Sequence, residues 1–409
     1  MQTELADFMK DTPDGEEAAA IIGRCVHCGF CNATCPSYQL LGDELDGPRG
    51  RIYLIKQVLE GSTPSASTRL HLDRCLGCRA CETTCPSGVQ YGRLLDIGRS
   101  AVAQRTRRPA GQAALRWLLR TGLSSRLFAP ALALGRVLRP LLPAVLRDHI
   151  PLARAPGAWP ARPHSHRMLL LAGCVQPAML PNINAATARV LDALGVQLVV
   201  PPHAGCCGAL HQHLDDPVGA QRMARRNIDA WWPHIESGCE AILVNASGCG
   251  AHVTEYAHLL RHDPGYAERA RRVSTLAKDP CEVLPALLAM RPIRQPRQRP
   301  RVTFHPPCTL QHGLKIRGAV ETMLTALGCE LLPYAETHLC CGAAGTYSLT
   351  QPEIADALRE RKLMHLGNAA PELILSTNVG CIAHLQAGTK TPVRHWIEWL
   401  DDNIKEICP

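Results

Sequence analysis

The chain has 409 residues, enough for two or three domains that each bury a hydrophobic core, so its twenty cysteines are not needed to staple an undersized fold. The N-terminal segment is acidic and polar, unlike a secretory signal, and this favours a reducing cytoplasmic location, where cysteines bind metals more often than they form disulfides. The net charge is +8, and nine arginines against one acid within residues 101–150 account for it, which excludes a protein that binds nucleic acid over its whole surface.

Two nearly identical cysteine runs stand in the first hundred residues. Each has the spacing C-x2-C-x2-C-x3-C followed by proline, at Cys25, Cys28, Cys31 and Cys35 and again at Cys75, Cys78, Cys81 and Cys85. Bacterial-type ferredoxins hold two [4Fe–4S] clusters with this spacing, and the fourth cysteine of each run binds the other cluster. We therefore expect a first cluster on Cys25, Cys28, Cys31 and Cys85, and a second on Cys75, Cys78, Cys81 and Cys35.

The sequence around these runs predicts a mainly helical two-cluster ferredoxin-like domain over residues 1–98. Residues 47–61 predict a helix, and residues 62–68 predict a loop. Four basic residues within or beside the runs either raise the cluster potentials or are solvated: Arg24, His27, Arg74 and Arg79. The alternative to clusters is a pair of structural zinc sites, which normally combine two C-x2-C motifs across a longer loop.

Residues 99–165 form a connector without cysteine, rich in arginine, leucine, alanine and proline. The segment QAALRWLLRTGL has the apolar spacing of a helix, with Arg116 and Arg120 one turn apart. Such a stretch either lies peripherally on an anionic membrane or packs on the protein's own domains. No apolar run of eighteen residues occurs, so we expect no transmembrane helix.

The remainder repeats itself, with one copy over residues 166–295 and a second over 296–409. In each copy an apolar run leads to a cysteine, a Cys-Cys-Gly motif follows 32 residues later, and a second apolar run closes on a further cysteine. The pattern predicts two open α/β units of the order strand, helix, strand, CCG, helix, strand, cysteine, helix. Ligands gather at the carboxyl ends of parallel strands, so we expect two metal or redox thiol sites rather than simple packing. The expected sites are Cys174, Cys206, Cys207 and Cys249 in the first copy, and Cys308, Cys340, Cys341 and Cys381 in the second.

The fold class expected for the whole chain is therefore α+β and multidomain. Four cysteines have no counterpart in either pattern, and we interpret them as structural: Cys239, Cys281, Cys329 and Cys408.

The spacing C-x31-CCG resembles that of the CCG-domain family, which includes heterodisulfide reductase subunits and iron–sulfur subunits of flavin-linked dehydrogenases. The cysteine runs, HLCCGAAGTYSLT and VRHWIEWL are similar to the iron–sulfur subunits of glycolate oxidase, from about residue 20 to about residue 400. One departure is that Ala246 and Asn378 stand where the full CCG pattern has a further cysteine. Each site then has four thiols, enough for one or two further clusters, and His252 and His384 are either additional ligands or ordinary helix residues.

No G-x-G-x-x-G follows a strand, so we expect no flavin or NAD in this chain, and no catalytic residue is assigned to it. The resemblance implies an electron-transfer subunit, which carries electrons from FAD-containing partners that oxidise glycolate to glyoxylate toward a quinone or other membrane acceptor. The alternative is a heterodisulfide-reductase-like enzyme that reduces a disulfide or quinone at a CCG site. A zinc protein with a structural or nucleic-acid-binding role is a third reading.

Overall fold

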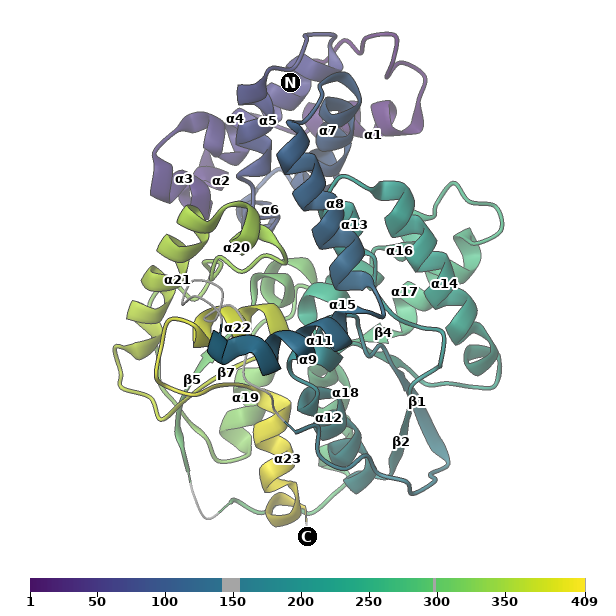
Figure 1. Cartoon of the computed structure of the whole chain (residues 1–409), viewed down its shortest axis with the longest axis vertical. Coiled ribbons are helices and arrows are strands. Elements are labelled where there is room, and N and C mark those ends of the chain that lie inside the picture. Colours follow the sequence, from purple (N-terminus) through teal and green to yellow (C-terminus); the bar gives the residue numbers. More distant parts are fainter. Residues whose placement is uncertain (142–154, 297–298, 409) are drawn as a thin grey trace.

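The computed structural model describes residues 1–141, 155–296 and 299–408. A helical N-terminal module occupies one end of the molecule, and two units that each contain a parallel sheet occupy the rest (Figure 1). The C-terminus lies at the end opposite the module (Figure 1). The α+β, multidomain fold expected from the sequence is thus observed.

The N-terminal module is helical because short capped segments alternate with the cysteine loops. Thr12 accepts a hydrogen bond from the backbone of Gly15 at the start of the first helix. The long helices α4 and α7 pack so closely that a Cβ on Gly98 would collide with the side chain of Ile55. The elements are α1 (Pro13–Gly23), α2 (Phe30–Ala33), α3 (Pro36–Leu41), the 3-10 turn η1 (Glu44–Asp46), α4 (Pro48–Leu59), α5 (Ala66–Asp73), α6 (Ala80–Thr84) and α7 (Tyr91–Arg105).

The helix expected over residues 47–61 is confirmed as α4. The loop expected over residues 62–68 is wrong at its end, because Ser65 forms a capping box with Thr68 and α5 begins at Ala66.

The described part of the connector contains α8 (Ala110–Ser124), α9 (Phe128–Leu138) and the 3-10 turn η2 (Arg139–Leu141). Its part from 142 to 154 lies outside the described residues. Arg108 and Arg116 each pair with Asp73 of the module and with Asp215 of the first α/β unit, at 2.5 to 3.0 Å. Arg108, just before α8, and Arg116, on α8, therefore join the module to the first α/β unit. In the described part of the chain, no helix has both the length and the apolar character needed to cross a membrane.

The first α/β unit contains a parallel sheet of strand order β2-β1-β3-β4. Its strands are short and buried, as expected when helices cover a parallel sheet. The strands are β1 (His166–Leu170), β2 (Val196–Val199), β3 (Ile242–Leu243) and β4 (Ala277–Lys278). The helices are α11 (Gln176–Met179), α12 (Asn182–Ala193), α13 (Ala209–His213), α14 (Pro217–Glu236), α15 (Ser247–Val253), α16 (Tyr256–Leu259), α17 (Ala267–Leu276) and α18 (Pro280–Ala289).

The second unit repeats this topology, with strand order β6-β5-β7-β8. Its strands are β5 (Arg301–His305), β6 (Glu330–Leu331), β7 (Leu373–Ser376) and β8 (Val393–His395). Its helical elements are the π-helical turn η3 (Thr309–Gly313), α19 (Ala319–Ala326), α20 (Tyr347–Thr350), α21 (Pro352–Gly367), α22 (Val379–Gln386) and α23 (Trp396–Ile407). Each sheet has one strand more than the three expected from the sequence, namely the edge strands β4 and β8.

The last helix of each unit packs against a helix of the other unit. Helix α23 of the second unit packs on α12 of the first, and α18 of the first packs on α19 of the second. Arg189 on α12 pairs with Asp401 on α23 at 2.6 Å, and one continuous hydrophobic core extends across both units. The pairing has the character of a twofold axis between the repeats, and it holds their cysteine motifs in a fixed relation.

Candidate metal centres

The two N-terminal cysteine loops have matching backbone geometry. His27 and Gly29 in the first loop, and Gly77 and Arg79 in the second, have positive φ angles between 56° and 83°. These left-handed residues turn the chain tightly, so that the cysteines before and after them face a common centre. The C-x2-C-x2-C spacing thus folds locally into two cup-shaped loops.

One pocket collects three cysteines of the first run together with the last cysteine of the second. Cys25, Cys28, Cys31 and Cys85 all line it, beside apolar side chains such as Ile52, and Cys81 borders it. Burial raises the pKa of the Cys31 thiol to about 11, and the neighbouring Cys25, Cys28 and Cys85 add to this rise. Cys28 is exposed, so this pocket reaches the protein surface.

Cys35 lies apart from the rest of its own run and among the cysteines of the second. Burial raises the pKa of Cys81, and Cys78, Cys75 and Cys35 raise it further. The Tyr91 hydroxyl donates to Cys75 Sγ at 3.7 Å. The second set is thus Cys75, Cys78, Cys81 and Cys35, the exchange of fourth cysteines that the spacing predicts. Buried thiols that raise one another's pKa are poor free thiolates, and binding to iron cations removes that penalty, so both sets fit iron–sulfur clusters.

The first α/β unit assembles its four cysteines from three strand ends. Burial and hydrogen bonds among Cys174, Cys206 and Cys207 couple the thiols, and the Gly208 N–H donates to Cys206 Sγ at 3.4 Å. Hydrogen bonds from Cys174 and Cys207 lower the pKa of Cys206 to about 3. Cys249 interacts with Cys207 from the start of α15. The structure therefore brings the predicted first CCG set together.

The second unit repeats this arrangement. The Cys308 thiol donates to Cys340 Sγ at 3.8 Å, and the Gly342 N–H donates to the same sulfur at 3.4 Å. Cys341 hydrogen-bonds with Cys381, which closes the set. Gly342 has φ of 92°, and a Cβ there would lie 2.4 Å from the carbonyl of Ala355, which explains the glycine of the CCG motif.

The two histidines that follow the last cysteine of each repeat differ in their contacts. His384 Nε2 bonds the carbonyl of Ala355 at 3.2 Å, so this nitrogen is engaged away from the thiols. His252 Nε2 is buried beside Gly208 and has no hydrogen-bond partner among the described residues. Both residues lie within helices, His252 on α15 and His384 on α22.

The four cysteines outside the pattern lie apart from these sets. The Cys239 thiol donates to the carbonyl of Ala241 at 3.1 Å, and Cys281 and Cys329 are buried in the shared core. Cys408 packs against the same core from α23. Their surroundings agree with a structural role.

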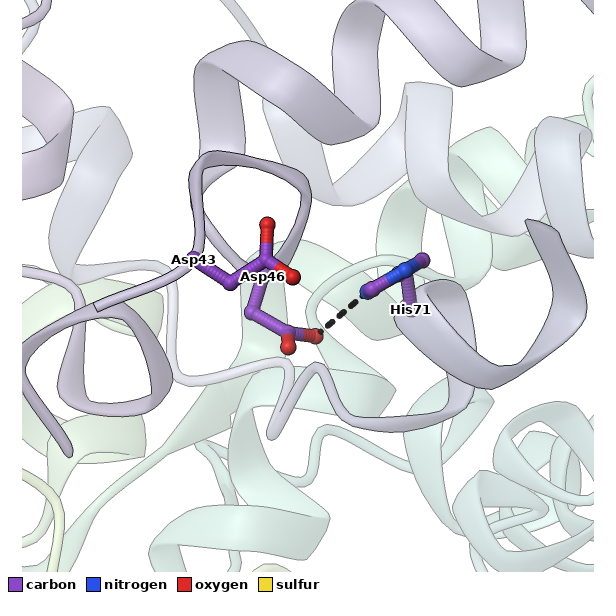
Figure 2. A group of neighbouring side chains, drawn as sticks. All are labelled: Asp43, Asp46 and His71. Carbon is purple, nitrogen blue, oxygen red and sulfur yellow. Dashed lines mark hydrogen bonds and ion pairs between the residues drawn. The ribbon is translucent and has the colours of Figure 1, made fainter. Parts of the chain in front are cut away.

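One non-cysteine group in the described part of the chain is compact enough for a single ion: Asp43, Asp46 and His71 (Figure 2). Its carboxylates are already engaged. Asp46 accepts from Arg74 at 2.8 Å and contacts His71 Nδ1 at 3.0 Å, and Asp43 accepts from the backbone of Leu45 at 2.9 Å. The group is an ion-pair network rather than a metal centre.

The N-terminal module docks against both α/β units. Arg79 and Arg93 pair with Glu255 of the first unit at 3.0 and 3.2 Å. Thr83 hydrogen-bonds His312 Nδ1 of the second unit at 3.0 Å. These contacts were not foreseen, since the sequence offers no signal for partners more than 150 residues apart.

Two protein-family models match separate parts of the chain. Residues 21–89 match the 4Fe-4S dicluster domain, and residues 168–254 and 302–386 each match the cysteine-rich domain called CCG. The glycolate oxidase iron–sulfur subunit of Escherichia coli (strain K12) is 51% identical over 99% of this chain and 100% of its own length. The chain belongs to the family of glycolate oxidase iron–sulfur subunits.

Other members and relatives extend this result. The probable glycolate oxidase iron–sulfur subunit of Bacillus subtilis (strain 168) is 31% identical over 89% of this chain and 88% of its own length. Lactate utilization protein A of Geobacillus thermodenitrificans (strain NG80-2) is 23% identical over 54% of this chain and 90% of its own length. The expected resemblance and internal repeat are confirmed, and the matched domains support iron–sulfur clusters as the cofactors.

Proposed function

We propose that this protein is the electron-transfer subunit of a complex that oxidises glycolate to glyoxylate. A flavin on a partner subunit accepts the hydride, and this chain conducts single electrons onward, since iron–sulfur clusters supply one-electron transfer. The observation that carries the proposal is the exchange of fourth cysteines between two matched loops, beside two further sets of four thiols. A disulfide-reducing role is less favoured, because Ala246 and Asn378 remove one thiol from each CCG set.

The ligand assignment within this proposal follows the four sets. One cluster binds Cys25, Cys28, Cys31 and Cys85, and the other binds Cys75, Cys78, Cys81 and Cys35. The CCG sets bind one or two further clusters, at Cys174, Cys206, Cys207 and Cys249 and at Cys308, Cys340, Cys341 and Cys381. The corresponding domains are residues 1–98, 99–165, 166–295 and 296–409.

The contacts between the parts support an order for the electron path. The first cluster pocket opens to the surface at Cys28, where a flavoprotein can approach. The second set faces the second repeat, because the Tyr347 hydroxyl donates to the carbonyl of Arg74 at 2.9 Å, and Cys308 helps to raise the pKa of Cys78 after burial. Electrons then pass from the surface cluster to the buried one and on to the second CCG site.

We further propose that the complex lies at the inner face of the cell membrane, with a quinone or other membrane acceptor as the final partner. The arginines of α8 are paired with aspartates of the protein, so their charges are not available to bind anionic lipid. What remains is an apolar outer surface on α8 and α9, formed by Trp117, Leu118, Leu127, Leu134 and Val137. Sedimentation should therefore show similar binding to neutral and anionic vesicles, and a Trp117→Ser/Leu118→Ser variant should bind less to both.

The decisive experiment uses the complex purified without oxygen. In a Cys78→Ala variant, glycolate should still reduce the flavin, but reduction of a soluble quinone analogue should fall at least tenfold. A Cys408→Ala variant is the matched control and should keep both steps. Unchanged quinone reduction in the Cys78→Ala complex would contradict the proposed electron path.

A further inference from the structure

A buried arginine lies beside the second N-terminal cysteine set. The side chain of Arg51 is 0% exposed, and so is that of Asp46. The guanidinium donates to Asp46 Oδ1 at 3.4 Å, to the carbonyl of His71 at 2.7 Å and to the hydroxyl of Ser37 at 3.1 Å. Its Nη1 points to Cys35 Sγ at 4.0 Å.

Within this network Arg51 has only a shared counter-charge. Arg51 and Arg74 share the single carboxylate of Asp46, which His71 also contacts (Figure 2). A buried guanidinium without a full counter-charge is strongly destabilising, so such groups are kept where another anion lies close. The nearest remaining acceptor of Arg51 is the sulfur of Cys35.

A second hydrogen-bond donor, on helix α7, contacts another cysteine of the second N-terminal set. Tyr91, at the start of α7, is buried and its hydroxyl donates to Cys75 Sγ at 3.7 Å. Arg51 and Tyr91 thus add a side-chain donor to Cys35 and Cys75 respectively, and the donor at Cys35 is charged.

The pocket lined by Cys25, Cys28, Cys31 and Cys85, here called the surface pocket, has no buried arginine beside its sulfurs among the residues that the structure describes. Its nearby arginine, Arg49, lies on the same helix as Arg51 but pairs with Glu44 at 2.6 Å. Both side chains of that pair are more than a third exposed, at 36% and 41%, so water screens what charge is left. On the same helix, the residue that follows Arg51 is Ile52, and it lines the surface pocket with an apolar side chain.

We propose that Arg51 sets the reduction potential of the cluster on Cys35, Cys75, Cys78 and Cys81, and holds it above that of the surface cluster. Reduction adds one negative charge to a cluster, and a buried cation with a hydrogen bond to a ligand sulfur stabilises the reduced form. The inference rests on the proposed function. Its consequence is that electrons entering at the exposed Cys28 settle on the inner cluster, next to the second repeat.

The test is a redox titration of the purified chain, followed by electron paramagnetic resonance, in Arg51→Gln, Arg51→Lys and Arg49→Gln variants. In Arg51→Gln the ratio of reduced to oxidised inner cluster at a fixed potential should fall at least tenfold, a shift of 59 mV for one electron. Arg51→Lys keeps the charge and should shift the same signal less. Arg49→Gln should leave both signals within twofold.

Tyr91→Phe provides a second reading if Arg51→Gln does not fold. It removes one donor to Cys75 and no ion pair, and it should lower the same potential by a smaller factor. Two cluster signals with unchanged potentials in Arg51→Gln, or in Tyr91→Phe if Arg51→Gln does not fold, would overturn the inference while leaving the proposed function intact. A chain that binds no iron in any variant, wild type included, would overturn the proposed function itself.

Discussion

The side-chain amide of Asn378 donates to Cys381 Sγ at 3.3 Å. Its oxygen accepts from the backbone N–H of Gly248 at 3.4 Å, next to Cys249 of the other repeat. A single side chain therefore stands between the two CCG sets, at a position where the family pattern has a cysteine. In the first repeat the matching residue, Ala246, makes no such link.

Replacing Asn378 by alanine should make the second site resemble the first. Loss of the hydrogen bond to Cys381 should lower the reduction potential of any cluster bound there and destabilise the fold by about 1 kcal/mol. Redox titration and chemical denaturation measure the two effects. Asn403→Ala is the control, because it removes a hydrogen bond from the Asn403 side-chain amide to the carbonyl of Trp399 within α23. It should change only stability.

The crossed assignment of the N-terminal cysteines makes a separate prediction. Cys28→Ala and Cys85→Ala should each remove the same resonance signal, and the double variant should lose no more iron than either alone, about four irons per chain. Cys35→Ala should remove the other signal. If Cys85→Ala and Cys35→Ala exchange these outcomes, each run binds its own cluster and the crossing is wrong.

Docking of the N-terminal module should depend on Glu255. Burial alone would raise the pKa of this carboxyl, but Arg79 and Arg93 hold it below its ordinary value. Glu255→Gln leaves two partly buried arginines facing each other and should cost about 1–3 kcal/mol of unfolding free energy. The exposed pair of Arg271 and Glu268 gives the control, and Glu268→Gln should change stability by less than about 0.5 kcal/mol.

Acid should weaken the joint between the repeats through His395. Its Nε2 donates to the carbonyl of Asn245 at 2.9 Å, and its Nδ1 accepts from the backbone of Ile397. Burial lowers the pKa of His395 to about 4. The neutral ring is therefore favoured in the folded state, and its full contribution is present above pH 6.5 and lost as pH falls toward 4.

The expected loss from this one residue is about 2 kcal/mol between pH 7 and pH 5. Denaturation of wild type and His395→Gln at both pH values isolates it, because glutamine can still donate to Asn245 and does not titrate. An identical pH dependence in the two proteins would show that His395 does not carry this effect.

The shape of each N-terminal cysteine loop could be predicted because its geometry is local, whereas the crossing of the fourth cysteines follows from the spacing that ferredoxins share. Spacing and a few left-handed residues shape each loop, and the CCG glycine is fixed by one carbonyl nearby. The duplication also supplies its own register, so the three cysteine-bearing strand ends of one copy can be matched to those of the other without a structure.

What surrounds the sets could not be predicted. Arg49 and Arg51 stand in one short basic stretch, and only packing decides that the second is buried beside Cys35. The basic residues suspected from their position beside the cysteines have other partners, since Arg79 pairs with Glu255 and Arg74 with Asp46. Burial and distant ion pairs depend on the tertiary fold, and the spacing of the cysteines does not specify that fold.

The exchange of α18 and α23 between the repeats has a consequence for biosynthesis. Helix α12 obtains its cover from α23, and the pair formed by Arg189 and Asp401 joins residues 212 positions apart. The first repeat thus stays unfinished on the ribosome until nearly the whole second repeat has emerged. Cluster delivery to either CCG site should accordingly be a late, post-translational event, and truncation within α23 should abolish both sites at once.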